Sequence, residues 1–392
     1  MRMYIAIGAG VLLNMCFGLM YAWSVFIDSL GQELDVGRGL ISLVFSVGIA
    51  SLTIGFFISH SLYSTVRLSY LIGALSTACA LGLVLAGAIP RLEAVIIGFG
   101  GIFGLASGVG YMVALQIAAN ALAKRAGLFT GITVAAFAAG AVIFSKLCTV
   151  GIETIGARNT FLVAAAVMAA LGLLIAIALA ASRLSIQLPR ANEREPLIER
   201  VLTVHPKIFL LLWIGFAFGC LAGLVGMSHA TGIIAAFGGS SGEILLGPIT
   251  INVGYIAGGI AMGWSSDRLP VKLGVVLVLA IAGVSILAVG FTGSPIQALI
   301  ALGFVGVAYG GMTTVYAVAI RRFYGRETVG RIFGRLLSAW GVAGLLAPWL
   351  AGVIYDLEGE YATAVTYAAI AAGLAVLASL ALPRAKHAVE AK

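Results

Sequence analysis

The chain has 392 residues, of which 61% are hydrophobic and 10% charged, and its mean hydropathy is +1.11. A soluble domain typically has about 25% charged residues, so this composition excludes an ordinary soluble fold. The formal net charge of +8 would suit a nucleic-acid partner, but the placement of the charges, described below, indicates a membrane surface instead.

Twelve apolar runs reach the length of about 20 residues that a membrane-spanning helix needs. The first run is too long for a signal peptide and lacks an A-x-A cleavage site, so we expect it to be the first membrane helix. The runs cover residues 4–27, 38–58, 68–89, 93–118, 128–150, 159–182, 207–236, 244–264, 272–292, 296–320, 328–354 and 362–382.

The one long polar stretch, residues 183–206, separates six apolar runs from six others. It predicts an N-terminal six-helix bundle (1–182), a cytoplasmic linker (183–206) and a C-terminal six-helix bundle (207–392). The fold class that we predict is an all-α membrane protein with twelve transmembrane helices in two pseudo-symmetric six-helix bundles. Glu153 and Glu243 are expected to lie in loops between these helices.

Glycine patterns recur at a nearly constant spacing, which indicates that the two halves are repeats of each other. Two repeated six-helix halves joined by a long loop are the layout of a rocking-bundle transporter. In such proteins the substrate site lies near the bilayer midplane, where the repeats meet. The matching pairs are Gly104-x3-Gly108 with Gly306-x3-Gly310, Gly127-x3-Gly131 with Gly330-x3-Gly334, Gly18-Leu19 with Gly223-Leu224, and Val47-Gly48 with Val253-Gly254.

The basic residues are distributed unevenly between the two sides of the predicted bundle. Of the 23 Lys and Arg residues, all but Arg38, Arg91, Lys146 and Arg158 fall on the side of the N-terminus. The positive-inside rule therefore predicts a multi-pass protein of the cytoplasmic (inner) membrane with both termini in the cytoplasm. The basic excess then faces anionic lipid, and no nucleic-acid partner is expected.

The sequence shows no pattern that indicates catalysis or a cofactor. The four cysteines (Cys16, Cys79, Cys148 and Cys220) lie in apolar runs without metal-ligand spacing, so we expect free thiols, no metal and no cofactor. The glycine-rich run 98–101 is not followed by the Lys-Ser/Thr of a phosphate-binding loop, which favours a packing surface. No Ser/His/Asp cluster is apparent, so we do not expect an enzyme.

The loop between the eighth and ninth runs, Gly263-Trp-Ser-Ser-Asp-Arg-Leu-Pro-Val-Lys272, resembles the G-x-x-x-D-R-x-x-x-K/R loop of the major facilitator superfamily. The resemblance implies that Asp267 and Arg268 stabilise one conformation and so act in gating. The corresponding loop of the first half, residues 59–67, lacks the Asp-Arg pair.

Three further segments resemble the oxalate/formate antiporter family, whose members are related to monocarboxylate porters. They are Tyr21-Ala-Trp-Ser-Val-Phe26, Lys124-Arg-Ala-Gly-Leu-Phe-Thr-Gly131 and the stretch 330–356. This resemblance implies exchange or proton-coupled transport of small organic anions without ATP. However, Gly259 stands where that family commonly has Arg, and Trp340 where it commonly has Lys, which disfavours a dicarboxylate.

Ionisable residues inside a membrane are functional candidates by default, and three stand out. Lys146 would attract an anion, although a lysine that snorkels to the interface is an alternative. His229 could bind a proton, or it could be a neutral histidine hydrogen-bonded between helices. Arg335 would be a cation of the cavity or of a gate.

Polar side chains that recur at helical spacing complete the candidate site, with hydrogen bonding between helices as the alternative. Proton coupling through Asp28 or His229 and exchange without a proton both stay open. The predicted substrate-binding residues are Asn14, Tyr21, Tyr111, Lys146, His229, Asn252, Tyr255, Tyr309, Tyr316, Arg335 and Trp340, and the predicted coupling or gating residues are Asp28, Asp267 and Arg268.

These patterns predict a secondary active transporter that moves a small organic anion, a monocarboxylate, across the cytoplasmic membrane by alternating access. The expected partners are the small-molecule substrate, the lipid bilayer and either protons or a counter-substrate, and we expect a monomer. Two alternatives stay open: an exporter of neutral or amphipathic molecules on the same fold, and a receptor or scaffold that is derived from a transporter.

Overall fold

The computed structural model describes residues 2–121, 126–182, 206–266, 268–325 and 329–383. Within these ranges every regular element is helical, and twelve helices or helix stacks are long and apolar enough to cross a membrane. The predicted fold class is therefore confirmed. The chain divides into two compact units, residues 1–193 (unit 1) and 194–392 (unit 2), and each is described below by itself. The predicted linker lies outside the described residues except for Pro206.

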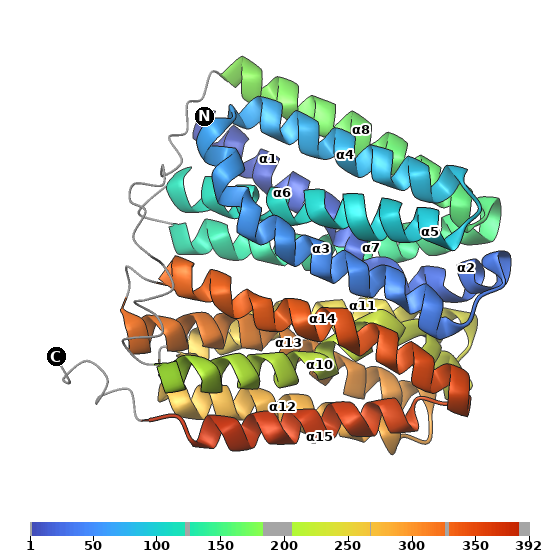
Figure 1. Cartoon of the computed structure of the whole chain (residues 1–392), viewed down its shortest axis with the longest axis vertical. Helices are drawn as coiled ribbons and strands as arrows, with labels where there is room; N and C mark the ends of the chain where they lie inside the picture. Colours follow the sequence, from blue (N-terminus) through green and yellow to red (C-terminus); the bar gives the residue numbers. More distant parts are fainter. Residues whose placement is uncertain (1, 122–125, 183–205, 267, 326–328, 384–392) are drawn as a thin grey trace. The chain divides into compact units, whose positions relative to one another are not determined.

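Unit 1 begins with a stack of three consecutive helical segments, α1 (Arg2–Phe17), the 3-10 segment η1 (Gly18–Phe26) and α2 (Ile27–Leu34). The α4 and α8 helices run side by side in this unit (Figure 1). The other elements of unit 1 are α3 (Arg38–Thr65), α4 (Leu68–Ala88), α5 (Leu92–Val95), the π-helical segment η2 (Ile96–Phe103), α6 (Gly104–Ala121), α7 (Ala126–Ile155) and α8 (Ala157–Ser182).

Unit 2 consists of six long helices. The α12 and α15 helices lie side by side in it, and α10 packs against α13, α14 and α15 (Figure 1). The helices are α10 (Pro206–Ala236), α11 (Ser241–Ser266), α12 (Val271–Gly290), α13 (Pro295–Tyr324), α14 (Val329–Glu358) and α15 (Ala362–Leu380).

Several helices extend beyond the apolar runs that predicted them. The first helical stack continues to Leu34, where Asp35 ends it in a left-handed conformation, and α7 continues to Ile155, where Gly156 has a φ of 85°. The expectation that Glu153 and Glu243 are loop residues was therefore wrong, because Glu153 lies in α7 and Glu243 in the first turn of α11. A helix ends where the backbone is capped, and this point need not coincide with the end of an apolar run.

Close contact between α11 and α13 depends on the glycine pair that the sequence analysis singled out. A methyl group on Gly306 would lie 2.0 Å from the carbonyl oxygen of Ile251, and one on Gly310 would lie 1.9 Å from that of Tyr255. Only glycine therefore allows the two backbones to approach this closely, as is typical of helix packing in membranes.

The matching pair in unit 1 makes the same kind of contact, between α6 and α3. A methyl group on Gly104 would lie 2.7 Å from the carbonyl oxygen of Gly48, and one on Gly108 would lie 2.1 Å from that of Leu52. The recurrence of the glycine pair in the sequence thus corresponds to a recurrence of one helix–helix contact in the two units.

The first long helical element of each unit departs from α-helical geometry at corresponding positions. In unit 1 the departure is the 3-10 segment η1, residues 18–26, and in unit 2 it is His229, with a φ of −116° and a ψ of 17°. When the two halves of the sequence are aligned on Gly18 and Gly223, His229 corresponds to Ser24, which lies inside η1. Interruptions of this kind are typical of the helices that form transporter binding sites.

Candidate functional site

In unit 1, three of the predicted residues, Asn14, Tyr21 and Tyr111, contact one face of α7. The ring of Tyr21 from η1 meets Phe137 of α7 edge-on, with the centroids 4.9 Å apart, and Tyr111 of α6 meets the same ring at 5.6 Å. One turn before Phe137, the Asn14 side-chain amide donates a hydrogen bond of 2.5 Å to the carbonyl oxygen of Thr133. We call Asn14, Tyr21, Tyr111 and Phe137 the unit 1 cluster.

In unit 2, three predicted residues from three helices meet in a buried group, which we call the aromatic cluster. The Trp340 indole N–H of α14 donates a hydrogen bond of 2.6 Å to the Tyr309 hydroxyl of α13. The Tyr255 ring of α11 packs on the Tyr309 ring at 5.5 Å, edge to face. All three side chains are at most 9% exposed, and none carries a charge in its ordinary protonation state.

The two positions where the oxalate/formate family commonly has cations differ in the space that they leave for a side chain. Trp340 is buried and its indole N–H is bonded to Tyr309, so an indole occupies the space that the resemblance assigns to a lysine. Gly259 is half-buried, and a methyl group there would have its nearest neighbour, the Gly310 carbonyl oxygen, 3.7 Å away. The Gly259 position therefore has room for a side chain.

His229 is fully buried and hydrogen-bonded to two other helices. Its Nε2 lies 2.9 Å from the carbonyl oxygen of Pro348 in α14, and its Nδ1 lies 3.2 Å from the hydroxyl of Tyr361, the residue that precedes α15. His229 thus connects α10, α14 and the start of α15 at the point where α10 is interrupted.

Asn252 and Tyr316 lie within the helix packing of unit 2. The Asn252 amide donates to the Pro248 carbonyl oxygen of its own helix at 2.8 Å, and the Tyr316 ring packs on Phe216 of α10 at 4.8 Å. Both side chains are fully buried. A role for them in substrate binding stays a prediction.

Lys146 lies deeper in its span than any other Lys, Arg, Asp or Glu of the described spans. The span covers Gly131–Ile155, so at 1.5 Å per residue Lys146 lies about 14 Å from the nearer end. Its side chain is exposed, and among the described residues no hydrogen-bond or ion-pair partner is found for its ammonium group.

Arg335 is half-buried and lies near the beginning of the α14 span, Ile332–Glu358. Its carbonyl oxygen accepts a hydrogen bond of 2.7 Å from Ser338, whose hydroxyl in turn accepts one of 2.9 Å from the Trp213 indole of α10. These bonds hold the first turns of α14 against α10.

Three residues were predicted to act in coupling or gating. Asp28 lies on the first turn of α2, with its side chain partly exposed, and forms an ion pair with Arg38 at the start of α3. Arg268 stacks its guanidinium over the Trp264 ring at 3.9 Å and donates to the Trp264 carbonyl oxygen at 2.8 Å. Asp267 lies outside the described residues.

Two partners of the predicted residues were missed in the sequence. Phe137 joins Tyr21 to Tyr111, and Tyr361 binds His229 although 132 positions separate them. For Phe137 a signal existed, because it follows Thr133 by one helical turn on a polar-aromatic face. Tyr361 gave no signal, because it stands at a helix start after an acidic turn and looks like an interfacial tyrosine.

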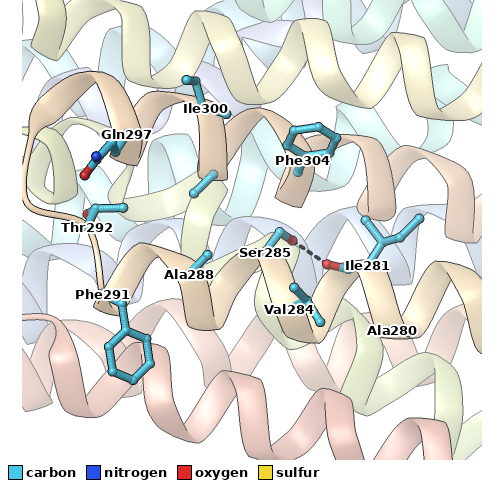
Figure 2. Close-up of a pocket in the computed structure, with 11 residues that line it drawn as sticks. Ala280, Ile281, Val284, Ser285, Ala288, Phe291, Thr292, Gln297, Ile300 and Phe304 are labelled. Atoms are coloured by element: carbon cyan, nitrogen blue, oxygen red, sulfur yellow. Dashed lines mark hydrogen bonds between the residues drawn. The ribbon is translucent and has the colours of Figure 1, made fainter.

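An apolar groove of about 760 Å³ runs between α12 and α13 (Figure 2). Its walls include Val284, Phe291, Ile300 and Phe304, which are strongly exposed, and its polar lining side chains among the described residues are Ser285, Thr292 and Gln297. None of the predicted site residues lies in it. Exposed apolar side chains within membrane spans are what lipid contact requires, so we assign this groove to the lipid-facing surface.

Neither a metal site nor a disulfide is found in the described part of the chain. No group of three or more His, Cys, Asp or Glu side chains there could hold a metal ion. The four cysteines are buried and free.

Residues 224–392 match the family model of the Major Facilitator Superfamily. Over most of its length the chain is similar to two curated proteins. One is the uncharacterised MFS-type transporter YhjX of Escherichia coli strain K12, which is 23% identical over 86% of this chain and 84% of that protein. The other is the uncharacterised MFS-type transporter YcxA of Bacillus subtilis strain 168, which is 24% identical over 92% of this chain and 90% of that protein.

A third curated relative, a gentisate transporter of Corynebacterium glutamicum, is 29% identical over 115 residues, which are 29% of this chain and 26% of that protein. Among solved structures, the nucleoside transporter NupG has a TM-score of 0.73 at 14% identity, covering 96% of this chain and 98% of that one. A bacterial homologue of the lysosomal transporter Spinster has a TM-score of 0.68 at 15% identity, covering 97% of each chain.

At these identities the two solved structures establish the fold and leave the substrate open. The family match in unit 2 and the two MFS-type relatives that cover most of the chain agree with the twelve-span fold, and the chain is thus similar to transporters of the Major Facilitator Superfamily.

Proposed function

We propose that this chain is a secondary active transporter of a small organic anion, with a monocarboxylate as the substrate. The similarity to a transporter superfamily narrows the function to the movement of a small molecule across a membrane. The chemistry of the substrate has to be argued from the side chains, and the position of Lys146 carries that argument.

Lys146 places a positive charge about 14 Å inside the α7 span, without a described acidic partner. A charge inside a membrane span is costly and is retained where it meets an ion or lines a polar pathway. At an effective dielectric constant of about 20, a carboxylate 4 Å from this ammonium would gain about 4 kcal/mol of Coulomb energy. A lysine in this position therefore favours an anionic substrate over a neutral one.

The predicted residues of unit 2 favour an anion with a single charge. The two cations that the oxalate/formate family commonly presents are replaced by Gly259 and by Trp340, whose indole is bonded to Tyr309. Indole, phenol and amide groups donate hydrogen bonds without adding charge. The replacement of these two cations by uncharged residues suits one carboxylate better than two. The partial similarity to a gentisate transporter points the same way, because gentisate is a carboxylate.

A second candidate function, export of neutral or amphipathic molecules, is favoured by the aromatic cluster of unit 2. Tyr255, Tyr309 and Trp340 form an uncharged group with flat apolar faces. Such faces bind planar or amphipathic molecules without the help of a charge. The two candidates differ in their dependence on Lys146, which exporters of neutral molecules would not need.

The test is transport by the purified protein in proteoliposomes, with a panel of labelled monocarboxylates, dicarboxylates and neutral amphiphiles. We expect saturable uptake of at least one monocarboxylate. Lys146→Gln should raise the KM for that acid about 10- to 100-fold, which corresponds to about 1.4–2.8 kcal/mol. Lys146→Arg, which keeps the charge, should retain most of the affinity.

Lys207→Gln is the matched control, because Lys207 is exposed at the beginning of α10 and lies close to the end of its span. It should leave the KM unchanged. Uptake of neutral compounds with no transport of any acid would refute the proposal in favour of the exporter. An unchanged KM in Lys146→Gln would show that Lys146 only snorkels to the membrane surface.

A further inference from the structure

The groove between α12 and α13 has the length of one leaflet of a membrane. Its lining begins at Ala280, in the middle of the 20-residue helix α12, and continues to the turn that joins the two helices (Figure 2). From Ala280 to the end of α12 at Gly290 the helix rises about 15 Å. The hydrocarbon core of a bilayer is about 30 Å thick, so one leaflet contributes about 15 Å. The groove therefore extends through one leaflet and ends near the bilayer midplane.

In their other halves, α12 and α13 are in close contact. A methyl group on Gly311 of α13 would lie 3.1 Å from Cγ2 of Val278 in α12, and one on Gly274 of α12 would lie 3.6 Å from Cγ1 of Val315 in α13. Small residues let helices pack closely in this way. From Ala280 onward the contact gives way to the open volume of about 760 Å³. The groove is thus the unfilled half of an otherwise packed helix pair.

The walls of the groove combine small side chains with large apolar ones that stay exposed. Val284 is 70% exposed, Ile300 57% and Phe304 55%. Exposed apolar side chains inside a membrane span require contact with other apolar groups, because the bilayer core holds no water. The small side chains that leave room between them are Ala280, Ala288 and Ala301.

The two hydroxyl groups of the lining are bonded within α12 or directly at its end. The Ser285 hydroxyl donates to the carbonyl oxygen of Ile281 at 2.6 Å, as Figure 2 shows, and the Thr292 hydroxyl donates to that of Val289 at 2.9 Å. Neither hydroxyl therefore needs a hydrogen-bond acceptor in the groove, and an apolar molecule can occupy it without leaving a donor unsatisfied.

Gln297 adds a polar group at the turn end of the groove. Its Oε1 accepts a hydrogen bond of 2.9 Å from the backbone N–H of Gly293, which orients the amide. The side chain is exposed, and within the described ranges no partner is found for the hydrogens on Nε2. No charged residue occurs between Lys272 and Arg321. Gln297 therefore offers N–H donors to an oxygen acceptor without selecting the net charge of the ligand.

From these features we propose that the α12–α13 groove binds one acyl chain of a membrane phospholipid, whose ester or phosphate oxygens accept a hydrogen bond from the Gln297 amide. The groove is continuous with the lipid-facing surface of the two helices, which includes the exposed side chains of Leu287 and Ile296. An acyl chain is apolar over one leaflet and ends in oxygen acceptors, as the groove requires. The proposal does not depend on which substrate the protein transports.

A second copy of the chain fits the groove less well than a lipid does. A membrane-spanning helix is about 10–12 Å wide with its side chains and crosses the whole bilayer. Such a helix would meet the groove over only half of its length, because the groove covers α12 only from Ala280 to the turn. It would also bring no acceptor specifically to Gln297, whereas the acceptor groups of a phospholipid lie directly above its acyl chains.

A bound acyl chain would supply contacts that α12 and α13 lack in this half. Atoms that line an unfilled gap lose part of their attraction to neighbours. A ligand that binds the folded protein and not the unfolded chain stabilises the folded state in proportion to its occupancy. Phospholipid should therefore raise the melting temperature of the detergent-purified protein.

The first test uses the wild-type protein. A phosphatidylcholine with a diazirine in the middle of one acyl chain is added to the purified protein in detergent and irradiated, and the labelled residues are identified by peptide mass spectrometry. We expect the labelling to concentrate around Ser285 and Ala288. Unlabelled phosphatidylethanolamine and phosphatidylglycerol should compete about equally, because the groove carries no charge.

Two results of this experiment would overturn the proposal. Labelling spread over all exposed apolar faces in proportion to their exposure would show an adventitious lipid only. A protein that is dimeric in the same detergent, with the groove protected from the probe, would assign the groove to a contact between two copies.

Three variants test the groove itself. Ala288→Phe places a ring in the groove at an exposed position, so it should lose most of the labelling. Leu287→Phe is the matched control, because it places the same ring on the neighbouring residue, which is 40% exposed and lies outside the groove. It should keep the labelling. Gln297→Glu keeps the acceptor for Gly293 and loses the amide donor, so it should weaken labelling about threefold to tenfold.

The melting temperature in detergent is a readout that does not use the cross-linker. Phosphatidylethanolamine added to lipid-depleted wild type should raise it by several degrees, and glycerophosphoethanolamine, the same headgroup without acyl chains, should leave it unchanged. Leu287→Phe should show the full increase and Ala288→Phe less than half of it. Equal increases in the wild type and in both variants would show that lipid acts at another surface and would contradict the proposal.

Discussion

Two adjacent glycines of α11 should respond in opposite ways to the same substitution. A methyl group on Gly258 would lie 1.9 Å from the Val307 carbonyl oxygen and 2.6 Å from the Val307 carbonyl carbon. A methyl group on Gly259 would meet nothing closer than the Gly310 carbonyl oxygen at 3.7 Å. Gly258→Ala and Gly259→Ala therefore each add one methyl group to α11. At position 258 the methyl group overlaps the backbone of α13, and at position 259 it enters open space.

The size of the effect follows from these distances. Ordinary van der Waals contact begins at about 3.4 Å, so the alanine at position 258 forces α11 and α13 apart by about 1.5 Å. A gap of 0.5–1 Å already removes about a quarter to a half of the attraction between packed atoms. Overpacking typically costs about 1–3 kcal/mol, and we expect Gly258→Ala to lie near the upper end. Gly259→Ala should be neutral or slightly stabilising, because alanine favours the helix.

The measurement is the apparent melting temperature of each purified variant in the same detergent. Melting is monitored as the loss of monodisperse protein on heating. For a unit of this size, 1 kcal/mol corresponds to about 2–4 °C. Gly258→Ala should therefore melt about 5–10 °C below the wild type, and Gly259→Ala within about 2 °C of it. Equal melting temperatures for the two variants would contradict the close approach of α11 and α13 through Gly258.

Three further outcomes are expected. Trp340→Phe removes the hydrogen-bond donor to Tyr309 and keeps an aromatic ring, so it should lower the stability by about 1 kcal/mol. In uptake assays it should also change the relative KM values of different substrates more than the control Lys207→Gln does. Arg158→Gln removes the guanidinium that donates to the carbonyl oxygens of Gly87 and Ala88 at the end of α4, and it should lower the melting temperature by a few degrees, whereas Arg158→Lys should restore part of the loss. The four buried cysteines should resist a thiol reagent in the folded protein and all react after unfolding in SDS; rapid labelling of any of them in the folded state would contradict its burial.

The sequence alone predicted the twelve spans, because an unbroken apolar run of about 20 residues has few structures open to it in lipid other than a helix. It also predicted which glycines matter, since Gly104 and Gly108 recur as Gly306 and Gly310 at the same spacing. In a bilayer these two patterns depend on length and side-chain size, which are local properties of the chain.

Only the tertiary structure showed which polar residues meet. His229 was recognisable as a buried ionisable residue, but its partners, Pro348 and Tyr361, lie more than a hundred positions away and carry no distinguishing pattern. The ion pair of Asp28 with Arg38, ten positions along the chain, likewise became apparent only in the structure. Hydrogen bonds across helices depend on how each helix is rotated and where it is interrupted, and packing between distant segments decides both.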